Sequence, residues 1–134
     1  MPVENLRTDG GQGVITICSG VLGAAEFIRA IRERCQPDAA LRDVRYYITD
    51  HRAVTHFDMT SDDIVELTRI SGGASLENPQ ICLATVVAGD LGFGIVRMWY
   101  GYAEGVAWRC RLFRDRAEAE RWLREEVDAG LTFV

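Results

Sequence analysis

The chain contains 134 residues and carries a formal net charge of −5. That length is typical of one domain and suffices to bury a core without a disulfide or a metal ion. The hydrophobic fraction of 48% and the charged fraction of 26% exclude a disordered chain. The sequence has no run of about 18 apolar residues, which excludes a membrane-spanning helix. Its acidic balance argues against nucleic-acid binding, because phosphate recognition needs a basic face.

Residues 1–7 show neither the basic start nor the apolar stretch of a secretory signal, so we expect a cytoplasmic protein with no membrane partner. The four cysteines, Cys18, Cys35, Cys82 and Cys110, form no C-x-x-C pair and no spacing typical of a zinc module. In a reducing compartment we expect them to be free thiols. We also expect no cofactor.

The first predicted elements are a β-hairpin and a helix. Segments 3–6 and 14–18 favour strands, and residues 8–11 between them contain turn-forming Asp and Gly. Gly20 is expected to end the second strand. Residues 24–35 place apolar side chains at helical spacing, which predicts an amphipathic helix.

A third strand and a second helix follow. Residues 44–49 are rich in β-branched and aromatic side chains, which favour a strand. Thr60 and Asp63 form the capping-box pattern that starts a helix. That helix is expected to cover residues 61–70 and to end at the Ser-Gly-Gly sequence at 71–73.

Residues 81–88 are almost uninterrupted apolar sequence. The length of this run and its Ile, Val and Thr content predict a strand buried on both faces, in the interior of a sheet. A turn at 89–92 then leads into a helix predicted over 93–103. Residues 106–113 alternate between apolar and arginine side chains, which indicates a half-exposed strand near a sheet edge.

The last predicted helix begins after Asp115, which forms a second capping-box pattern with Glu118, and ends before Gly130. The apolar tail at 131–134 is expected to pack on the domain or on a second subunit. The order ββαβαβαβα predicts an α/β fold in a single domain over 1–134. We expect a small, mostly parallel sheet of about five strands with four helices, in which only the first hairpin is antiparallel.

Three segments of the chain carry a family resemblance. They are Ile-Thr-Asp at 48–50, Gly-Phe-Gly-Ile-Val-Arg-Met at 92–98, and residues 106–123, with Phe-Arg-Asp at 113–115 and Ala-Glu-Arg-Trp-Leu at 119–123. With the element order, they resemble the STAS or SpoIIAA-like proteins, named for bacterial anti-sigma-factor antagonists, over roughly residues 13–124. The similarity is closest to the uncharacterised SpoIIAA-like branch. It implies a small sheet with helices packed on it, and a non-enzymatic regulatory or protein–protein interaction module.

The resemblance also implies a phosphorylation switch at the start of a helix. In anti-sigma antagonists a serine in an Asp-Ser-Ser-Gly-like turn is the switch, and the nearest match here makes Thr60 and Ser61 the candidates. No glycine follows, and the carboxylates of Asp62 and Asp63 would oppose a phosphate of about −1.5 to −2 charges. Helix capping by Thr60 accounts for these residues and is the favoured interpretation.

Asp50, His51, His56 and Asp58 are the only cluster of metal-ligand side chains in the sequence. On one strand the spacing of the two histidines places them on opposite faces. A connection that bends could still bring them together. A metal-dependent enzyme using His51 and His56 is therefore the third hypothesis, and two polar residues on a connection are the favoured interpretation.

Gly89, Gly92 and Gly94 follow the predicted interior strand and lead into a helix. Backbone N–H groups in that context can bind a phosphate or another anion, and Arg97 could assist. The spacing is not that of a dinucleotide-binding loop, so a tight turn is the favoured interpretation. A small-molecule binding domain, with an apolar or anionic ligand near this turn, is the alternative function.

Trp99 and Tyr100 occupy adjacent helical positions, whose side chains point about 100° apart. We expect an exposed aromatic here to mark a contact with a protein partner or with a second copy in a homodimer. No catalytic triad order and no nucleophile elbow is present. The leading hypothesis is therefore an interaction module without enzymatic activity.

Overall fold

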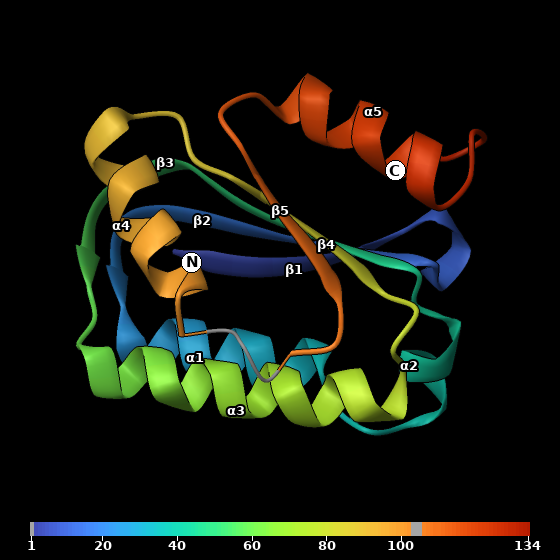
Figure 1. The fold of residues 1–134 in the computed structure, drawn as a ribbon, viewed down its shortest axis with the longest axis horizontal. Coiled ribbons are helices and arrows are strands. Elements are labelled where there is room, and N and C mark those ends of the chain that lie inside the picture. The colour runs from blue at the N-terminus through green and yellow to red at the C-terminus, as the bar shows by residue number, and fades with distance from the viewer. Residues whose placement is uncertain (1, 103–105) are drawn as a thin grey trace.

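The computed structural model describes residues 2–102 and 106–134. Figure 1 shows a central sheet with helices α1 and α3 on one face, α5 on the other, and α4 near one end. The strands are β1 (Val3–Thr8), β2 (Gly13–Gly23), β3 (Tyr46–Asp58), β4 (Cys82–Val86) and β5 (Arg109–Phe113). The helices are α1 (Ala24–Arg34), α2 (Ala39–Asp43), α3 (Ser61–Glu77), α4 (Asp90–Tyr100) and α5 (Arg116–Glu126), and a 3-10 turn covers Asp9–Gly11.

The strands lie in the sheet in chain order, β1-β2-β3-β4-β5. The pair β1 and β2 is antiparallel, and the other neighbouring strands are parallel. Strand β4 lies between β3 and β5, so that Ala84 is paired with Ile48 on one side and with Arg111 on the other. These observations confirm the predicted α/β fold with a mostly parallel sheet. They also confirm that the run at 81–88 supplies an interior strand and that β5 lies at an edge.

Side chains that alternate along the interior strands contribute to two separate core layers. On β3, Tyr47 belongs to the layer under α1 and α3, whereas Tyr46 and Ile48 belong to the layer under α5. All three side chains are fully buried. Leu131 and Phe133 complete the second layer, which confirms that the C-terminal tail packs on the domain.

Strand β2 continues past Gly20 to Gly23, so the predicted strand end at Gly20 is wrong. Gly20 adopts a φ of +65°, and the pairing of β2 with β3 shifts its register between Gly20 and Val21. A bulge with a glycine in the left-handed region bends a strand without ending it. Strands β2 and β3 therefore run on together beyond the end of β4.

Helix α3 continues through the Ser-Gly-Gly sequence to Glu77, so its predicted end at residue 70 is wrong. The side chains of Ala74 and Ser75, beyond the glycines, are buried. The Ser75 hydroxyl donates to the carbonyl oxygen of Gly72 at 2.7 Å and accepts from the amide of Ala107 at 3.1 Å. Packing of this last turn stabilises a helix that the local propensity of two glycines does not favour.

Helix α4 begins at Asp90, three residues before its predicted start, with Gly89 as the N-cap residue. Gly92 and Gly94 therefore lie inside the helix, and the expected turn at 89–92 is shorter than predicted. The predicted helix end at residue 103 lies outside the described residues. The described part of the chain also contains one helix more than the four expected. This additional helix, α2, is capped by the Asp38 carboxylate, which accepts from the amide of Leu41 at 3.2 Å.

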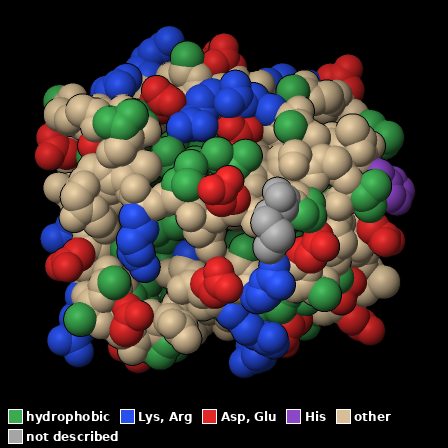
Figure 2. Space-filling model, turned by 180° about the vertical axis from the view of Figure 1, so that it is seen from behind, with side chains coloured by type: hydrophobic (Ala, Val, Ile, Leu, Met, Phe, Trp, Pro, Cys, Tyr) green, Lys and Arg blue, Asp and Glu red, His purple; other side chains and the backbone are tan. Residues whose placement is uncertain are grey.

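Charged side chains of both signs are mixed on the surface. Figure 2 shows arginine and acidic side chains next to one another over the face of the molecule seen from behind. Arg32 on α1 pairs with Glu66 on α3 at 2.8 Å, and Arg69 pairs with the same carboxylate at 2.5 Å. No helix in the described part of the chain combines the length and the hydropathy that a bilayer crossing requires.

Candidate functional site

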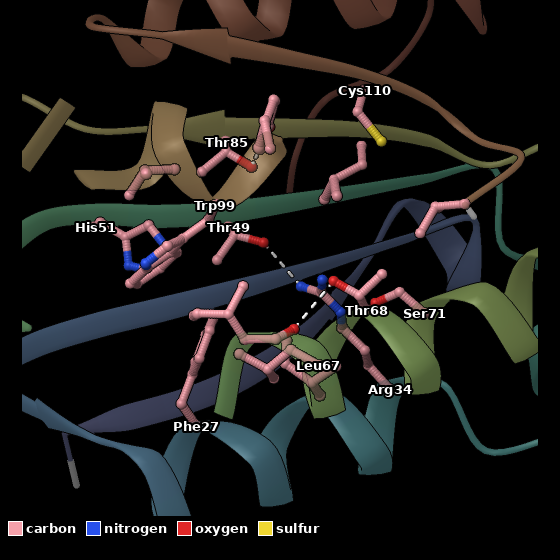
Figure 3. Close-up of a pocket in the computed structure, with 16 residues that line it drawn as sticks. Phe27, Arg34, Thr49, His51, Leu67, Thr68, Ser71, Thr85, Trp99 and Cys110 are labelled. Atoms are coloured by element: carbon pink, nitrogen blue, oxygen red, sulfur yellow. Dashed lines mark hydrogen bonds between the residues drawn. The ribbon is translucent and has the colours of Figure 1, made fainter. Parts of the chain in front are cut away.

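A cavity of about 110 Å³ lies between the sheet and helices α1, α3 and α4 (Figure 3). Its walls come from five elements that are distant in the sequence, and from Val106 and Cys110 near the start of β5. Parallel strands in chain order place their crossover helices α1, α3 and α4 together, which is why these elements meet here. The cavity lies in the core layer under α1 and α3, on the side of the sheet that faces away from α5.

Most of the cavity wall is apolar. Phe27 contributes from α1, Leu67 from α3, Leu83 from β4, and Val96 and Trp99 from α4. Phe27 and Val96 are buried, and Trp99 is partly buried against the same core layer. Such a wall favours an apolar occupant.

His51 on β3 is enclosed by aromatic rings at one side of the cavity. Its ring makes edge-on contacts with Phe27, Phe57 and Trp99, at centroid distances of 5.5, 5.4 and 6.1 Å. Burial lowers the pKa of His51 to about 3, although nearby Asp50 acts in the opposite direction. The ring is therefore neutral at pH 7. Its Nδ1 atom is buried and has no hydrogen-bond partner among the described residues.

Arg34, the last residue of α1, lies in the cavity wall with only 5% of its surface exposed. Its Nη1 atom donates to the Thr16 hydroxyl at 3.0 Å and to the Thr49 hydroxyl at 2.9 Å. Its guanidinium carbon lies 4.5 Å from the ring centroid of Tyr47. The Nε atom is buried without a hydrogen-bond partner in the described part of the chain.

Hydroxyl groups add further polarity to the cavity wall. Figure 3 shows the Thr49 hydroxyl directed at the Arg34 guanidinium, with Thr68 and Ser71 of α3 on the same side of the cavity. Across the cavity the Tyr100 hydroxyl donates to the Thr85 hydroxyl at 2.7 Å. The cavity therefore has a polar side formed by a cation and hydroxyls, and an aromatic side formed around His51.

The reactive groups of the cavity are held in unreactive protonation states. Burial raises the pKa of the Cys110 thiol to about 11, so it remains a thiol at pH 7. Burial also raises the pKa of the Tyr100 hydroxyl, although its hydrogen bond to Thr85 acts in the opposite direction. With a neutral His51 beside them, these groups can bind and orient a molecule, but none is an activated nucleophile.

The candidate switch residues lie outside this cavity. Thr60 is the N-cap of α3: its hydroxyl accepts from the amide of Asp63 at 3.3 Å, and its own amide donates to the Asp63 carboxylate at 2.8 Å. This geometry confirms the capping-box prediction. Ser61 is exposed at the first helical position. Phosphorylation of either residue stays a prediction.

The candidate anion-binding residues lie at the start of α4. A second cavity, of about 260 Å³, is lined by Gly89, Gly92 and His51, so His51 contributes to both cavities. Gly92 packs closely: a Cβ atom there would lie 2.9 Å from the Val87 side chain. Arg97 is exposed on α4. Anion binding at this helix start stays a prediction.

The structure directs both candidate interface aromatics toward the cavity. Trp99 packs edge-on against Phe57 at 5.3 Å, and Tyr100 is anchored by its hydrogen bond to Thr85. The large apolar side chain that α4 exposes beside them is Met98. Binding of a protein partner or of a second copy through this helix stays a prediction.

The four predicted metal-ligand residues are not brought together as a set. No group of three or more potential ligands that could hold a metal ion is found within residues 2–102 and 106–134. Asp50 points to the opposite face of the sheet from His51, where Arg52 and Arg116 donate to its carboxylate. His56 and Asp58 are exposed on the extension of β3.

The sequence analysis did not single out Arg34, although the apolar pattern of α1 contained a signal for its burial. Phe27, Ile31 and Arg34 have the i, i+4, i+7 spacing of one helix face, so Arg34 extends the buried stripe of α1. Thr49 and His51 likewise alternate with Tyr47 on one face of β3. The position of charged Arg34 on the same helix face as the buried apolar residues indicated a polar group inside the core.

Comparison with known proteins gives no family assignment. The chain matches no protein-family model, and no curated protein matches it. The STAS-like resemblance therefore stays a prediction, and the cavity itself provides the argument for function.

Proposed function

We propose that this protein binds a small, largely apolar molecule in the cavity between the sheet and helices α1, α3 and α4. The observation that supports this proposal is an apolar cavity lined by Arg34 and His51, each of which has one buried polar atom, Nε and Nδ1, without a hydrogen-bond partner among the described residues. Buried polar groups without partners each cost free energy, and they are rare in folded proteins. Such groups beside an apolar cavity indicate a site that a largely apolar ligand with one polar end would fill.

The size of the cavity limits the ligand. A closed apolar cavity of about 150 Å³ accepts benzene, which has six heavy atoms. The volume of about 110 Å³ seen here therefore corresponds to a molecule, or the end of one, of roughly four or five heavy atoms. The sequence analysis gave a small-molecule binding domain as the alternative function. The present proposal keeps that function but places the site on the inner face of α4 instead of at the turn before it.

The first experiment measures binding of neutral apolar probes, benzene and 1-butanol, to the whole chain by methyl NMR. We expect the resonances of Leu83 and Val96 to shift on titration, because both side chains line the cavity. A matched pair of variants on α4 tests the location. Val96→Phe fills the cavity, whereas Leu91→Phe enlarges a side chain that is 81% exposed.

The proposal expects the Val96→Phe variant to lose probe binding at least tenfold and the Leu91→Phe variant to keep it. Circular dichroism establishes that each variant is folded. If Val96→Phe does not fold, Leu83→Phe fills the cavity from the sheet side. Probe binding that a folded, filled variant retains, or probe shifts confined to other parts of the molecule, would contradict the proposal.

A further inference from the structure

We propose that the ligand carries a carboxylate, which the Nε and Nη2 edge of Arg34 binds in two parallel hydrogen bonds. The inference rests on the proposed function, because it specifies the ligand of the same cavity. The guanidinium group has five N–H donors, and the inference follows from which of them already donate to the protein. The two hydrogens of Nη1 are used by Thr16 and Thr49, and Nε has no partner among the described residues.

The edge that remains is the one that recognises carboxylates. Guanidinium and carboxylate groups match as two forks, with two N–H donors facing two oxygens. This chain uses the same Nε and Nη2 edge twice elsewhere. Arg52 holds Asp50 with Nε–Oδ1 and Nη2–Oδ2 distances of 3.0 and 2.8 Å. Arg69 holds Glu66 with Nε–Oε2 and Nη2–Oε1 distances of 2.9 and 2.5 Å.

Arg34 differs from these two arginines in having no acidic partner among the described residues. It takes part in none of the ion pairs formed within residues 2–102 and 106–134. Arg52 and Arg69 have largely exposed side chains, whereas Arg34 is buried. A buried cation without a counter-ion is costly, and an anion bound in the cavity would remove much of that cost.

The surroundings position the Arg34 guanidinium without neutralising it. The Tyr47 ring lies below it, and the Tyr47 hydroxyl donates to the Arg34 carbonyl oxygen at 2.6 Å. The Thr16 hydroxyl donates to Asn5 Oδ1 at 2.7 Å, so its oxygen acts as the acceptor for Arg34. These contacts hold the planar group in one orientation, which preorganises it for a bidentate ligand.

The apolar wall fixes the rest of the ligand. The cavity volume leaves room for a short hydrocarbon chain attached to the carboxylate, directed toward the aromatic side around His51. A neutral imidazole enclosed by Phe27, Phe57 and Trp99 suits such an apolar end, because it carries no charge at pH 7. The ligand class is therefore a short-chain carboxylate.

The experiment compares butanoate with butanamide, which has nearly the same shape without the charge. Both are titrated into the whole chain at pH 7 and followed by methyl NMR of Leu83 and Val96. We expect butanoate to bind at least tenfold more tightly than butanamide. Equal affinities would overturn the carboxylate inference, and they would leave the proposed function standing if both compounds shift the cavity resonances. If neither compound nor benzene shifts them, the proposed function itself fails.

A matched pair of variants on α1 identifies the residue. Arg34→Met removes the buried charge at similar length, and Arg32→Met removes an exposed one from the same helix. We expect Arg34→Met to lose at least tenfold in butanoate affinity, with butanamide unchanged, and Arg32→Met to keep both affinities. Unchanged butanoate binding by folded Arg34→Met would overturn the inference. If that variant does not fold, Arg34→Lys keeps the charge without the fork and should still weaken butanoate selectively.

A carboxylate of the chain itself is the competing occupant of the Arg34 edge. Glu104 lies outside the described residues, so the Glu104→Gln variant is titrated in parallel. We expect its butanoate affinity to equal that of the parent chain. A tenfold gain in this variant would show that the chain supplies its own anion, which would overturn the inference.

Discussion

Asp9 is the residue that attaches the C-terminal tail to the rest of the molecule. It adopts a φ of +50°, and its carboxylate accepts four hydrogen bonds. The donors are the Tyr46 hydroxyl at 2.7 Å, the amide and hydroxyl of Thr132 at 2.8 and 2.7 Å, and the amide of Phe133 at 3.0 Å. Burial alone would raise the pKa of Asp9, but these hydrogen bonds lower it to about 2.

Replacing Asp9 with Asn should therefore destabilise the fold. Asparagine tolerates the left-handed backbone, so the substitution changes the hydrogen bonds rather than the turn. Its side-chain NH₂ group faces donors and cannot accept from them. We expect the free energy of unfolding in urea to fall by about 2 kcal/mol. Asp128→Asn, on an exposed residue whose side chain accepts only from the amide of Gly130 in the described structure, is the control and should change stability by far less.

His51 makes stability depend on pH, and between pH 6.5 and pH 5 it does so in a range where the carboxylates contribute little. Its pKa is about 3 in the folded chain and about 6.5 in the unfolded chain. The unfolded state therefore binds more protons below pH 6.5, and stability falls as the pH decreases from that value toward 3. Asp9 and Asp50, whose pKa values are lowered, change the stability mainly below pH 5, where their carboxyl groups take up protons in the unfolded chain, so the range from pH 6.5 to pH 5 reports on His51.

We expect the free energy of unfolding to decrease by about 2 kcal/mol between pH 8 and pH 5. Urea unfolding at a series of pH values measures this decrease. The His51→Phe variant, which keeps an aromatic ring among Phe27, Phe57 and Trp99, should show a nearly flat profile. His56→Gln, at an exposed histidine, should keep the decrease. A parent profile that is flat over this range would show that His51 is not held neutral.

At the scale of elements, α3 shows how packing overrides local sequence. Its two central glycines predict a helix end, yet the helix runs on because Ala74 and Ser75 are buried beyond them. Gly73 faces solvent, and a Cβ atom added to it would meet no atom within 4 Å. Its backbone is helical, so glycine there has only the disadvantage of a more flexible unfolded chain.

The Gly73→Ala variant should therefore stabilise the protein by about 0.5–1 kcal/mol. Thermal or urea unfolding measures the effect. The contrasting variant is Gly20→Ala, which places a side chain at a φ of +65° and should destabilise the bulge in β2. Loss of stability in Gly73→Ala would mean that the last turn of α3 is not helical in solution.

At the scale of the whole molecule, hydrophobic patterning predicted the architecture well. The unbroken apolar run at 81–88, the alternation at 106–113 and the capping patterns each led to the observed strand or helix. The boundaries that sequence missed depend on distant contacts. Bulged pairing with β3 extends β2 past Gly20, and burial of Ala74 extends α3. Neither contact leaves a local pattern.

The cavity was predicted less well because it depends on residues that meet only in three dimensions. His51 was singled out for metal binding, and Trp99 and Tyr100 for a protein interface, before the structure placed all three around one cavity. Arg34 was not singled out from the sequence. To predict that Arg34 lines a cavity, one must know which face of α1 the sheet covers. The sequence indicates that face only through the apolar stripe that includes Phe27.

The attachment of the tail determines how this chain can be modified for laboratory use. The amide of Asp9 donates to the main-chain carbonyl oxygen of Val134 at 2.8 Å, and the Val134 side chain is 85% exposed. A fluorescent protein or affinity label fused after Val134 keeps this contact, because a further peptide bond leaves that oxygen in place. Trimming the chain before Leu131 would instead uncover Tyr46 and produce an aggregation-prone surface.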